Sequence, residues 1–384
     1  MSDFNYVMGA RIDTTNADDF YNNAEAQFAE SGADRIIFDA AGLEYISSAG
    51  LRSLLKFRKK YGEANIINVS DDVYSIFDVT GFVDLLTITK AYKQYSVEGC
   101  PIVGKGAKGT VYRYDKETVV KVYNDKNSLE GIKQEMELAK KTFVLGLPTA
   151  ISYGVSMVGD KYASVFELID ADSVANLISK DNSTVDKYAV ILSDLAKLIH
   201  STEAINLDIQ HAEDYALKWI NTGLEYEDKE LAEKFRTMVN NLPKKNTLIH
   251  GDYHANNVMI QNGETVIIDM DRVAIGHPII ELSGIYQFYI SFGDVDRSIL
   301  EDFLGFSCET AKELYDAFIK YYLDTDDASY IEAVNNKAAL LSYVRLVHRV
   351  YKKGTDLSDK ARKECDYYMG KIRELSEVVT DFDF

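Results

Sequence analysis

The sequence HGDYHANN, at His250–Asn257, decides the fold of the larger part of this chain, together with Asp269 twelve residues further on. Asp252 can orient and deprotonate an attacking hydroxyl group. Asn257 and Asp269 offer a carboxamide and a carboxylate, whose oxygen atoms can hold Mg²⁺ on the phosphates of a nucleotide. Asp252 and Asn257 are five residues apart, as in the kinase pattern H-R-D-x-x-x-x-N. The stretch therefore predicts a site for phosphoryl transfer.

A turn signal explains how Asp269 can join this site. Asn262 and Gly263 lie between two runs of β-forming residues, and this dipeptide is typical of a tight hairpin. The hairpin folds Asp269 back toward Asn257, so that both can hold the same metal ion. Asp271 follows two residues later and is either a second ligand or a residue that supports the first.

A glycine-rich loop precedes this block. The sequence GKGAKGTVY contains Gly104, Gly106 and Gly109 in the pattern G-x-G-x-x-G-x-V. A dinucleotide-binding fold uses the same glycines to open a helix, but here the residues that follow predict a β-hairpin. Such a hairpin can lay backbone N–H groups over phosphates. Lys121 lies on the returning strand, where it either reaches the α and β phosphates or is an ordinary exposed lysine; its place between valines favours the first.

A lysine in this position needs an anionic partner, because a buried ammonium group is costly unless it is paired. A helix is expected at about residues 128–142, and it carries Glu135 and Glu137. Glu135 lies thirteen residues before Pro148, close to where kinases place the pairing glutamate, and is favoured. Glu137 lies on another face of the helix and is the alternative.

The sequence SVFELI at Ser164–Ile169 is an apolar strand that runs into polar residues. It suits a hinge between two lobes, in which the backbone at Phe166 and Leu168 binds the edge of a purine. A simple core strand fits the same pattern, because a hinge is also a core strand.

Together these motifs resemble the aminoglycoside phosphotransferase and choline kinase group of kinase-like folds, over roughly residues 101–350. The motifs that carry the resemblance are His250–Asn257, Ile267–Asp269, Gly276–Pro278 and Glu281-Leu282. The resemblance implies ATP or GTP with Mg²⁺, Asp252 as catalytic base, and Asn257 and Asp269 as metal ligands. It also implies that His250 and His254 brace the loop rather than react. His277 is expected in a turn.

Two absences favour a small-molecule kinase over a eukaryotic-type protein kinase. Gly251 follows His250 where regulated protein kinases have an arginine, and no long activation loop or A-P-E fits after Asp269. Beyond residue 300 the chain shows helical spacing, and in this fold class such helices wall the acceptor. Acidic residues there are compatible with a cationic acceptor such as an amine or amino sugar, or form a solvated face; they include Asp324, Asp326 and Asp327.

The first ninety residues alternate short strands with amphipathic helices and predict a small α/β domain with a mixed sheet. Arg35–Phe38 and Asn65–Val69 are expected strands. Between them, Tyr45–Arg52 (YISSAGLR) begins a helix that Ser47 or Ser48 caps.

This segment, with Phe77–Phe82 downstream, resembles a STAS domain, the fold of bacterial anti-sigma factor antagonists. In that family a serine at this turn is phosphorylated by a partner kinase, which switches off binding; the matching residue is Ser48. The chain differs in having Ser47 where the family often has Asp, and Ala49 after the serine. A phosphate at a helix N-terminus is favoured by the dipole and would disrupt an apolar partner surface. The alternative is that both serines only cap the helix.

The alternation of strands and helices ends at Lys93–Pro101, which predicts a STAS domain at 1–95 and a kinase-like domain at 96–384. The second domain is expected to be α+β and bilobal. Its β-rich lobe is expected at about 96–168 and its helical lobe at about 169–384.

Composition limits the partners. The net charge of -19 over 384 residues argues against nucleic acid and anionic membranes. No apolar run is long enough for a membrane span, and the first residues do not resemble a signal peptide. Three widely spaced cysteines make no metal or redox pattern, and a cytoplasmic location is expected.

The leading hypothesis is an ATP/Mg²⁺-dependent phosphotransferase that acts on a hydroxyl of a small molecule, with a STAS domain that regulates it or docks it to a protein partner. The alternative is a partner-switch regulator of the anti-sigma factor antagonist kind. Its kinase-like domain would phosphorylate a protein serine such as Ser48, or only sense nucleotide.

Overall fold

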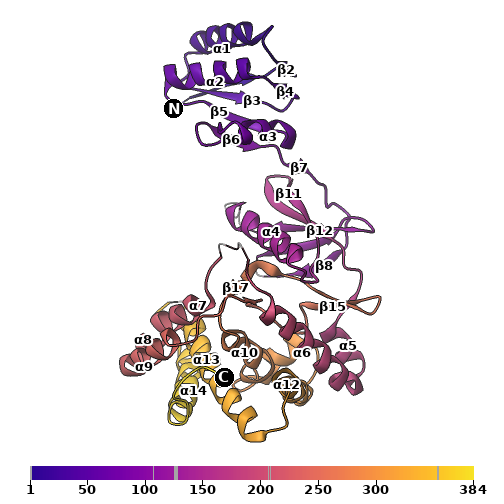
Figure 1. The fold of residues 1–384 in the computed structure, drawn as a ribbon, viewed down its shortest axis with the longest axis vertical. Coiled ribbons are helices and arrows are strands. Elements are labelled where there is room, and N and C mark those ends of the chain that lie inside the picture. The colour runs from indigo at the N-terminus through magenta and orange to yellow at the C-terminus, as the bar shows by residue number, and fades with distance from the viewer. Residues whose placement is uncertain (1, 107, 125–128, 206, 208, 353) are drawn as a thin grey trace. The chain divides into compact units, whose positions relative to one another are not determined.

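The computed structural model describes residues 2–106, 108–124, 129–205, 207, 209–352 and 354–384. The chain divides into two compact units, which are described separately (Figure 1). The first comprises Met1–Ser96 with Val155–Asp160, and the second comprises Val97–Gly154 with Lys161–Phe384. The sequence analysis places the domain boundary after residue 95, and the first unit ends at Ser96. The segment Val155–Asp160, which is later in the chain, is also grouped with the first unit.

The first unit is built on a four-stranded sheet of order β1-β3-β5-β6. Each of its pairs is parallel, so the mixed sheet predicted from the sequence is wrong for the described residues. The physical reason is that a helix connects each strand to the next, which returns the chain to the same end of the sheet. The elements are β1 (Asp3–Val7), β2 (Arg11–Ile12), α1 (Ala17–Ser31), β3 (Arg35–Asp39), β4 (Tyr45–Ile46), α2 (Ser48–Tyr61), β5 (Asn65–Val69), α3 (Asp71–Val79), β6 (Thr87–Lys90) and β7 (Lys93–Gln94).

Helix α1 has its apolar residues at helical spacing, as expected for the amphipathic helices of this domain. Ala17, Phe20, Ala24 and Phe28 are its buried residues, and they pack into the same core as the sheet. Fully burying a phenylalanine side chain stabilises the fold by about 1.5–3 kcal/mol. The aromatic residues of this core therefore account for much of the stability of the unit.

Helix α2 packs so closely on the strand pair β2–β4 that one residue must be glycine. A methyl group at Gly50 would lie 2.7 Å from side-chain atoms of both Ile12 and Ile46. The two isoleucines are buried, at 2% and 1% exposure, so they have little room to move. This close approach sets where the N-terminus of α2, and therefore Ser48, is held.

The second unit begins with a β-rich lobe. Strands β8, β9, β10 and β12 pair in antiparallel fashion, in the order β12-β10-β9-β8, and β11 lies beside β12. The elements are β8 (Ile102–Lys105), β9 (Gly109–Arg113), β10 (Thr118–Tyr123), α4 (Leu129–Val144), β11 (Ser152–Val158) and β12 (Lys161–Glu167). The helix expected from about residue 128 is α4; Ser128 lies outside the described residues.

The rest of the second unit is mostly helical and surrounds two short sheets, β13-β15-β16 and β14-β17. No helix among its described residues, or among those of the first unit, is both long and apolar enough to cross a membrane. The elements are β13 (Asp172–Ser173), α5 (Val174–Lys180), η1 (Asn182–Thr184), α6 (Val185–Ser201), α7 (Ala212–Trp219), η2 (Ile220–Leu224), α8 (Glu225–Glu227), α9 (Lys229–Asn240), β14 (Leu248–Ile249), β15 (Val258–Gln261), β16 (Glu264–Ile267), η3 (Met270–Arg272), β17 (Ala274–Ile275), α10 (Ile279–Tyr286), η4 (Gln287–Ser291), α11 (Arg297–Leu304), α12 (Cys308–Leu323), α13 (Ala328–Tyr351) and α14 (Asp359–Ser376).

The contact at Gly50 gives a testable prediction. Gly50→Ala should destabilise the first unit by about 1–3 kcal/mol, because the added methyl overpacks a core that cannot yield. Gly42→Ala is the matched control, since a methyl there meets nothing within 4 Å. Hydrogen exchange of β3 and β5 in the intact chain measures the effect, because a chain with two compact units need not unfold in one step. Equal protection in the two variants would contradict the packing argument.

Candidate active site

The loop His250–Asn257 is held by a buried carboxylate that the sequence analysis quoted but gave no role. Glu281 on α10 accepts hydrogen bonds from the backbone N–H groups of His250 and Gly251, each at 2.7 Å. His200 Nε2 lies 3.3 Å from the same carboxylate, which is only 3% exposed. Burial raises the pKa of Glu281, but the bonds from His200 and the loop outweigh it, and the net pKa lies below its ordinary value. The role of Glu281 could have been suspected from the sequence, because it is a charged residue within the apolar run of α10.

Gly251 is required by the backbone rather than by chemistry. Its φ of 79° is in the left-handed region, and a Cβ there would lie 2.3 Å from the carbonyl oxygen of Arg272. The close approach brings Arg272 Nη1 to 3.6 Å from Asp252 Oδ1. Arg272 was missed from the sequence, because it neighbours Asp252 only after the hairpin has folded.

Asn257 lies at the C-terminal end of the loop His250–Asn257 and is held by two hydrogen bonds. Its Nδ2 donates to the carbonyl oxygen of Asp252 at 3.0 Å, and its own carbonyl oxygen accepts from the N–H of Ile268 at 2.9 Å. No hydrogen bond of the described residues uses Asn257 Oδ1, the atom that a metal ion would take. The ring of His254 packs against Phe288, with centroids 4.6 Å apart. Burial lowers the pKa of His254 to about 4, so this histidine is neutral at ordinary pH and braces the loop.

Strands β15 and β16 form the hairpin that the Asn262-Gly263 signal predicts. Both turn residues have positive φ, 53° and 87°, as a type I′ turn requires. Asp269 follows the second strand in a left-handed conformation, with φ 64° and ψ 59°. Its Oδ1 lies 3.7 Å from Lys121 Nζ. The hairpin thus carries Asp269 to the lysine of the β-rich lobe.

Lys121 on β10 has the glutamate partner that was favoured from the sequence. Its Nζ lies 2.7 Å from Glu135 Oε1 on α4, and Tyr123 donates to Glu135 Oε2 at 3.0 Å. Glu135 is 6% exposed, so this carboxylate is fixed from both sides. Glu137, the alternative, instead lies 3.5 Å from Lys141 at the surface.

The three glycines of the loop serve different needs. Gly109 packs against β10, where a Cβ would lie 2.2 Å from the carbonyl oxygen of Val122. Gly106 faces open space, and Gly104 has only ordinary contacts. Absence of a side chain at Gly104 and Gly106 therefore leaves backbone accessible, whereas Gly109 is needed for the sheet itself. Ala107, in the same motif, lies outside the described residues.

Lys108 links the glycine loop to Asp271. Its ammonium group makes an ion pair with Asp271 Oδ2. The other oxygen of this carboxylate, Oδ1, is buried and has no hydrogen-bond partner among the described residues. One oxygen of Asp271 is thus paired with Lys108, and the other accepts no hydrogen bond from the described residues. Asp271 lies two positions after Asp269 in the sequence.

The hinge prediction meets an obstacle at Leu168. Its N–H donates to the carbonyl oxygen of Glu117 at 2.7 Å, so this structure does not offer that group to a purine. Phe166 lies opposite Val119 in the β12–β10 ladder. A purine contact with the Leu168 N–H would require the bond to Glu117 to break, and the hinge at Phe166 and Leu168 stays a prediction.

The residues fit a magnesium site that is completed by phosphate. Asn257 Oδ1 and the carboxylate of Asp269 are hard oxygen ligands of the kind that Mg²⁺ prefers. Within the described residues, no group of three or more His, Cys, Asp and Glu side chains could hold a metal ion by itself. A two-ligand site agrees with this, because Mg²⁺ commonly keeps few protein ligands and takes the rest from phosphate and water.

In the first unit the two serines at the start of α2 have separate positions. Ser47 is the cap, and its side chain accepts from the N–H of Ala49 at 3.2 Å. Ser48 is the first residue of the helix and is exposed. The capping role therefore belongs to Ser47, which leaves the hydroxyl of Ser48 accessible at the helix N-terminus.

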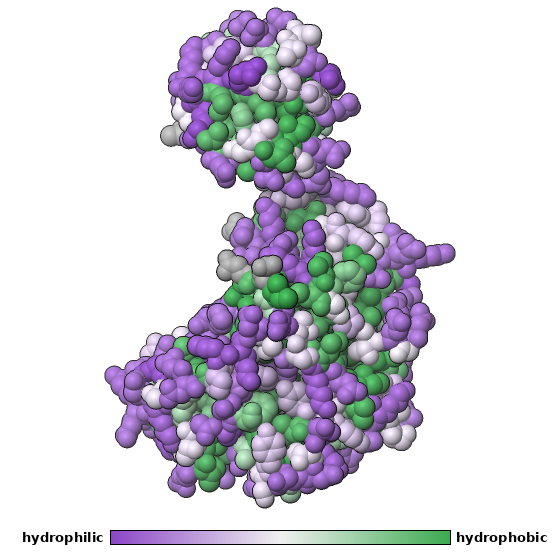
Figure 2. Space-filling model, in the orientation of Figure 1, coloured by the Kyte–Doolittle hydropathy of each residue, from purple (hydrophilic) through white to green (hydrophobic). Residues whose placement is uncertain are grey.

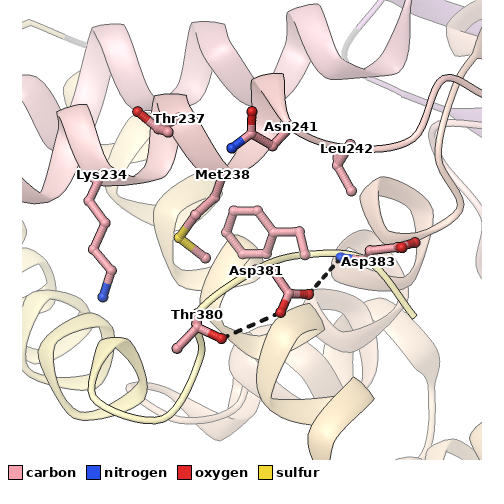
Figure 3. A pocket seen from close by; sticks show the side chains of 9 residues that line it. Lys234, Thr237, Met238, Asn241, Leu242, Thr380, Asp381 and Asp383 are labelled. Carbon is pink, nitrogen blue, oxygen red and sulfur yellow. Dashed lines mark hydrogen bonds between the residues drawn. The ribbon is translucent and has the colours of Figure 1, made fainter.

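A cavity of about 320 Å³ lies elsewhere, between α9 and the C-terminal segment (Figure 3). Asp381 accepts from Thr380 and from the N–H of Asp383. Lys234 of α9 and Asn241, which directly follows this helix, also line the cavity. None of the candidate site residues lines it. It holds no arrangement of carboxylates and glycines for a nucleotide.

Two family models match the sequence of this chain. The sequence model of the phosphotransferase enzyme family matches residues 100–329, and that of the STAS domain matches residues 5–95. The chain therefore belongs to the phosphotransferase enzyme family and carries an N-terminal STAS domain. A putative anti-sigma factor antagonist of Bordetella bronchiseptica, BtrV, is 29% identical over 84 residues, which are 21% of this chain and 72% of that protein.

Solved structures resemble the second unit. Aminoglycoside phosphotransferase APH(4)-Ia has a TM-score of 0.50 at 11% identity, over 72% of this chain and 93% of that one. ADP-bound APH(2'')-Ib gives 0.48 at 18% identity, over 74% and 94%. A choline/ethanolamine kinase family protein from Mesorhizobium loti gives 0.46 at 12%, over 73% and 88%. The predicted two-domain fold, STAS-like and then kinase-like, is confirmed.

The anchoring of the loop by Glu281 gives the second prediction. Glu281→Gln should lower the free energy of unfolding of the second unit by about 1–3 kcal/mol, since an amide cannot accept from both His250 and Gly251. Glu264→Gln, on the exposed hairpin, is the control and should stay within about 0.5 kcal/mol. Urea unfolding followed by circular dichroism measures both.

The effect of Glu281→Gln should depend on pH. Because the folded pKa of Glu281 lies below its ordinary value of 4.5, the folded state binds fewer protons than the unfolded state in this range. The stabilisation is therefore present above about pH 4.5 and is lost as the pH falls through the folded pKa. The difference between variant and wild type should shrink on acidification. A difference that grows toward low pH would contradict the assignment.

Proposed function

We propose that this chain transfers the γ-phosphoryl group of ATP or GTP to a hydroxyl group of a small molecule, with Mg²⁺, and that its STAS domain docks or regulates it through a protein partner. The observation that carries the proposal is the contact of Lys121 with both Glu135 and Asp269. In kinase-like folds the lysine–glutamate pair and a metal-binding aspartate must both be in place for transfer.

Each residue has a stated task in this proposal. Bound Mg²⁺ would neutralise charge on the phosphates, held by Asn257 Oδ1 and Asp269. Lys121, steadied by Glu135, positions the α and β phosphates, and the backbone near Gly104 and Gly106 covers them. These contacts supply orientation and charge neutralisation, which are the main needs of phosphoryl transfer.

Asp252 acts as the base that accepts the proton of the attacking hydroxyl. Its backbone carbonyl is held by Asn257, and its side chain is partly exposed beside Arg272. Arg272 keeps the carboxylate oriented until the acceptor arrives. Glu281 fixes the backbone on the N-terminal side of Asp252, so the base is positioned from both directions.

The STAS domain supplies a surface for a protein partner. Large hydrophobic side chains are exposed on this unit, among them Val7, Val79 and Leu85, and Figure 2 shows hydrophobic residues on its visible face. Exposed apolar residues of this kind commonly mark binding sites. The exposed hydroxyl of Ser48 allows a phosphate to alter such binding by adding charge.

Replacement of the base tests the catalytic proposal. Asp252→Asn should lower acceptor-dependent release of ADP by about 10²–10⁴-fold, because proton transfer contributes on that order. Asp359→Asn, on the exposed start of α14, is the control and should retain wild-type turnover. A coupled assay with a panel of hydroxyl compounds measures the rates. Acceptor-stimulated turnover that survives Asp252→Asn would remove the assignment.

A second candidate acceptor, a protein serine, is favoured by the position of Ser48. Intact mass of the full chain after incubation with ATP and Mg²⁺ should show no added phosphate if the acceptor is a small molecule. A gain of one phosphate that disappears in Ser48→Ala, but remains in Ser47→Ala, would show that the acceptor is Ser48. Asp252→Asn then distinguishes transfer by this chain from transfer by a contaminating kinase.

A further inference from the structure

Two arginines lie one turn apart on the same face of α13, and each rests on aromatic rings. The guanidinium carbon of Arg345 lies 5.1 Å from the ring centroid of Trp219 and 5.9 Å from that of Phe288. That of Arg349 lies 5.0 Å from the ring of Phe292. Stacking of this kind uses the flat face of the guanidinium and leaves its N–H groups pointing outward along the edge.

Neither arginine has a counter-ion in the described part of the chain. No hydrogen bond or ion pair joins Arg345 or Arg349 to another described residue, although the chain has 61 acidic residues against 42 basic ones. Like charges four residues apart on a helix repel each other. Burial lowers the pKa of Arg345 to about 10, so it remains charged at neutral pH. Arg345 is partly buried and Arg349 is exposed. A partly buried guanidinium without a counter-ion among the described residues, beside an exposed one, is suited to bind an anion.

Arg345 is linked to the catalytic loop through one aromatic ring. His254 packs on Phe288, and Phe288 in turn lies against the guanidinium of Arg345. The charges that act on Arg345 are, in order, those of Asp252, Arg272, Glu281 and Arg349. The base of the reaction is therefore the foremost charge in the surroundings of Arg345.

The surroundings of Arg345 are shaped to hold it. A Cβ at Gly284 of α10 would lie 2.8 Å from Arg345 Nη1, so the glycine leaves room for the guanidinium. Trp219 directly precedes the π-helical segment η2, and Phe288 belongs to the π-helical segment η4. π-helical turns are rare and often occur at functional sites. Gly284 of α10, Trp219 of α7 and Phe288 of η4 thus lie around this one side chain.

Besides Asp252 and Glu281, Asp294 lies near α13 and accepts from Tyr343 at 2.6 Å. Three further acidic residues lie at the start of the helix. Asp324 ends α12, and Asp327 caps α13 by accepting from Ser329 and Tyr330. Asp326 lies 2.6 Å from Lys320. These carboxylates complete a turn between two helices, which explains them without a cationic acceptor.

We propose that Arg345, together with Arg349, binds a carboxylate or phosphate group of the acceptor, so that the acceptor is a small alcohol carrying a negative charge rather than an amine or amino sugar. A guanidinium matches both anions with two parallel hydrogen bonds. The same charge repels a cationic acceptor. This inference rests on the proposed function, because it names the substrate class of the same site.

Trp219 is the single tryptophan of the chain and reports on the site directly. We would saturate the full-length protein with ADP and Mg²⁺ and then titrate it with glycerol 3-phosphate, glycerate, glycerol or choline. A saturable change in tryptophan emission is expected with the two anions and not with glycerol or choline. No saturable change with either anion, or the same change with glycerol or choline, would overturn the proposal.

Variants assign the response to the arginine. Arg345→Gln should weaken the binding of glycerol 3-phosphate by about tenfold or more, since it removes a charge-assisted pair of bonds. Arg345→Lys keeps the positive charge but cannot donate two parallel hydrogen bonds, so its affinity for glycerol 3-phosphate should lie between those of the wild type and Arg345→Gln. Arg373→Gln, an exposed arginine on α14 that lies 3.9 Å from Asp228, should bind as wild type does. Wild-type affinity in a folded Arg345→Gln protein would contradict the assignment.

Turnover separates this inference from the proposed function. If Asp252-dependent transfer occurs to neutral or cationic alcohols and not to anionic ones, the anion site is wrong and the phosphotransferase remains. If transfer to every alcohol in the panel is independent of Asp252, the proposed function is wrong. The tryptophan titrations then still decide whether Arg345 binds anions.

Discussion

The ion pair between Lys121 and Glu135 is the interaction on which the candidate site depends. It joins the sheet of the β-rich lobe to α4, and through the 3.7 Å approach of Asp269 it reaches the hairpin that follows the catalytic loop. Both groups are largely removed from water, where loss of one partner would leave an uncompensated charge. The pair therefore stabilises the arrangement of the lobe on which the proposed nucleotide site rests.

A second buried carboxylate does the same for the catalytic loop. Glu281 binds two consecutive N–H groups of the loop, and Gly251 allows the chain to turn closely past Arg272. The proposed base, Asp252, is held through the backbone on one side and through Asn257 on the other. The structure thus fixes the position of this carboxylate.

Local signals were sufficient for much of the fold. Asn262-Gly263 predicted the hairpin because a type I′ turn needs φ above zero at both residues, and α1 followed its apolar spacing. The parallel sheet was missed because strand direction depends on which strands pair, and periodicity within one strand carries no such information. The kinase-like fold of the second unit was instead predicted from the order of the motifs along the chain.

The site was harder to predict where contacts are distant in sequence. Glu281 reaches the loop from thirty residues away, and Arg345 is linked to the loop through Phe288, which packs on His254. Leu168 looked available for a purine until its N–H was found bonded to Glu117. Gly109 is predicted to contact phosphate, and its packing against Val122 is a second reason for a glycine there that the motif does not reveal. Motif spacing identifies candidate residues, and packing decides which atoms they expose.

The central claim is that Asp269 holds a metal ion on a nucleotide that Lys121 positions. Calorimetric titration of the protein with a non-hydrolysable ATP analogue, with and without Mg²⁺, tests it most directly. The account predicts that Mg²⁺ tightens binding by about tenfold or more, or 1.4 kcal/mol, in the wild type, and that Asp269→Asn removes this dependence. Binding that is equally tight without Mg²⁺, or equally Mg²⁺-dependent in Asp269→Asn, would contradict it.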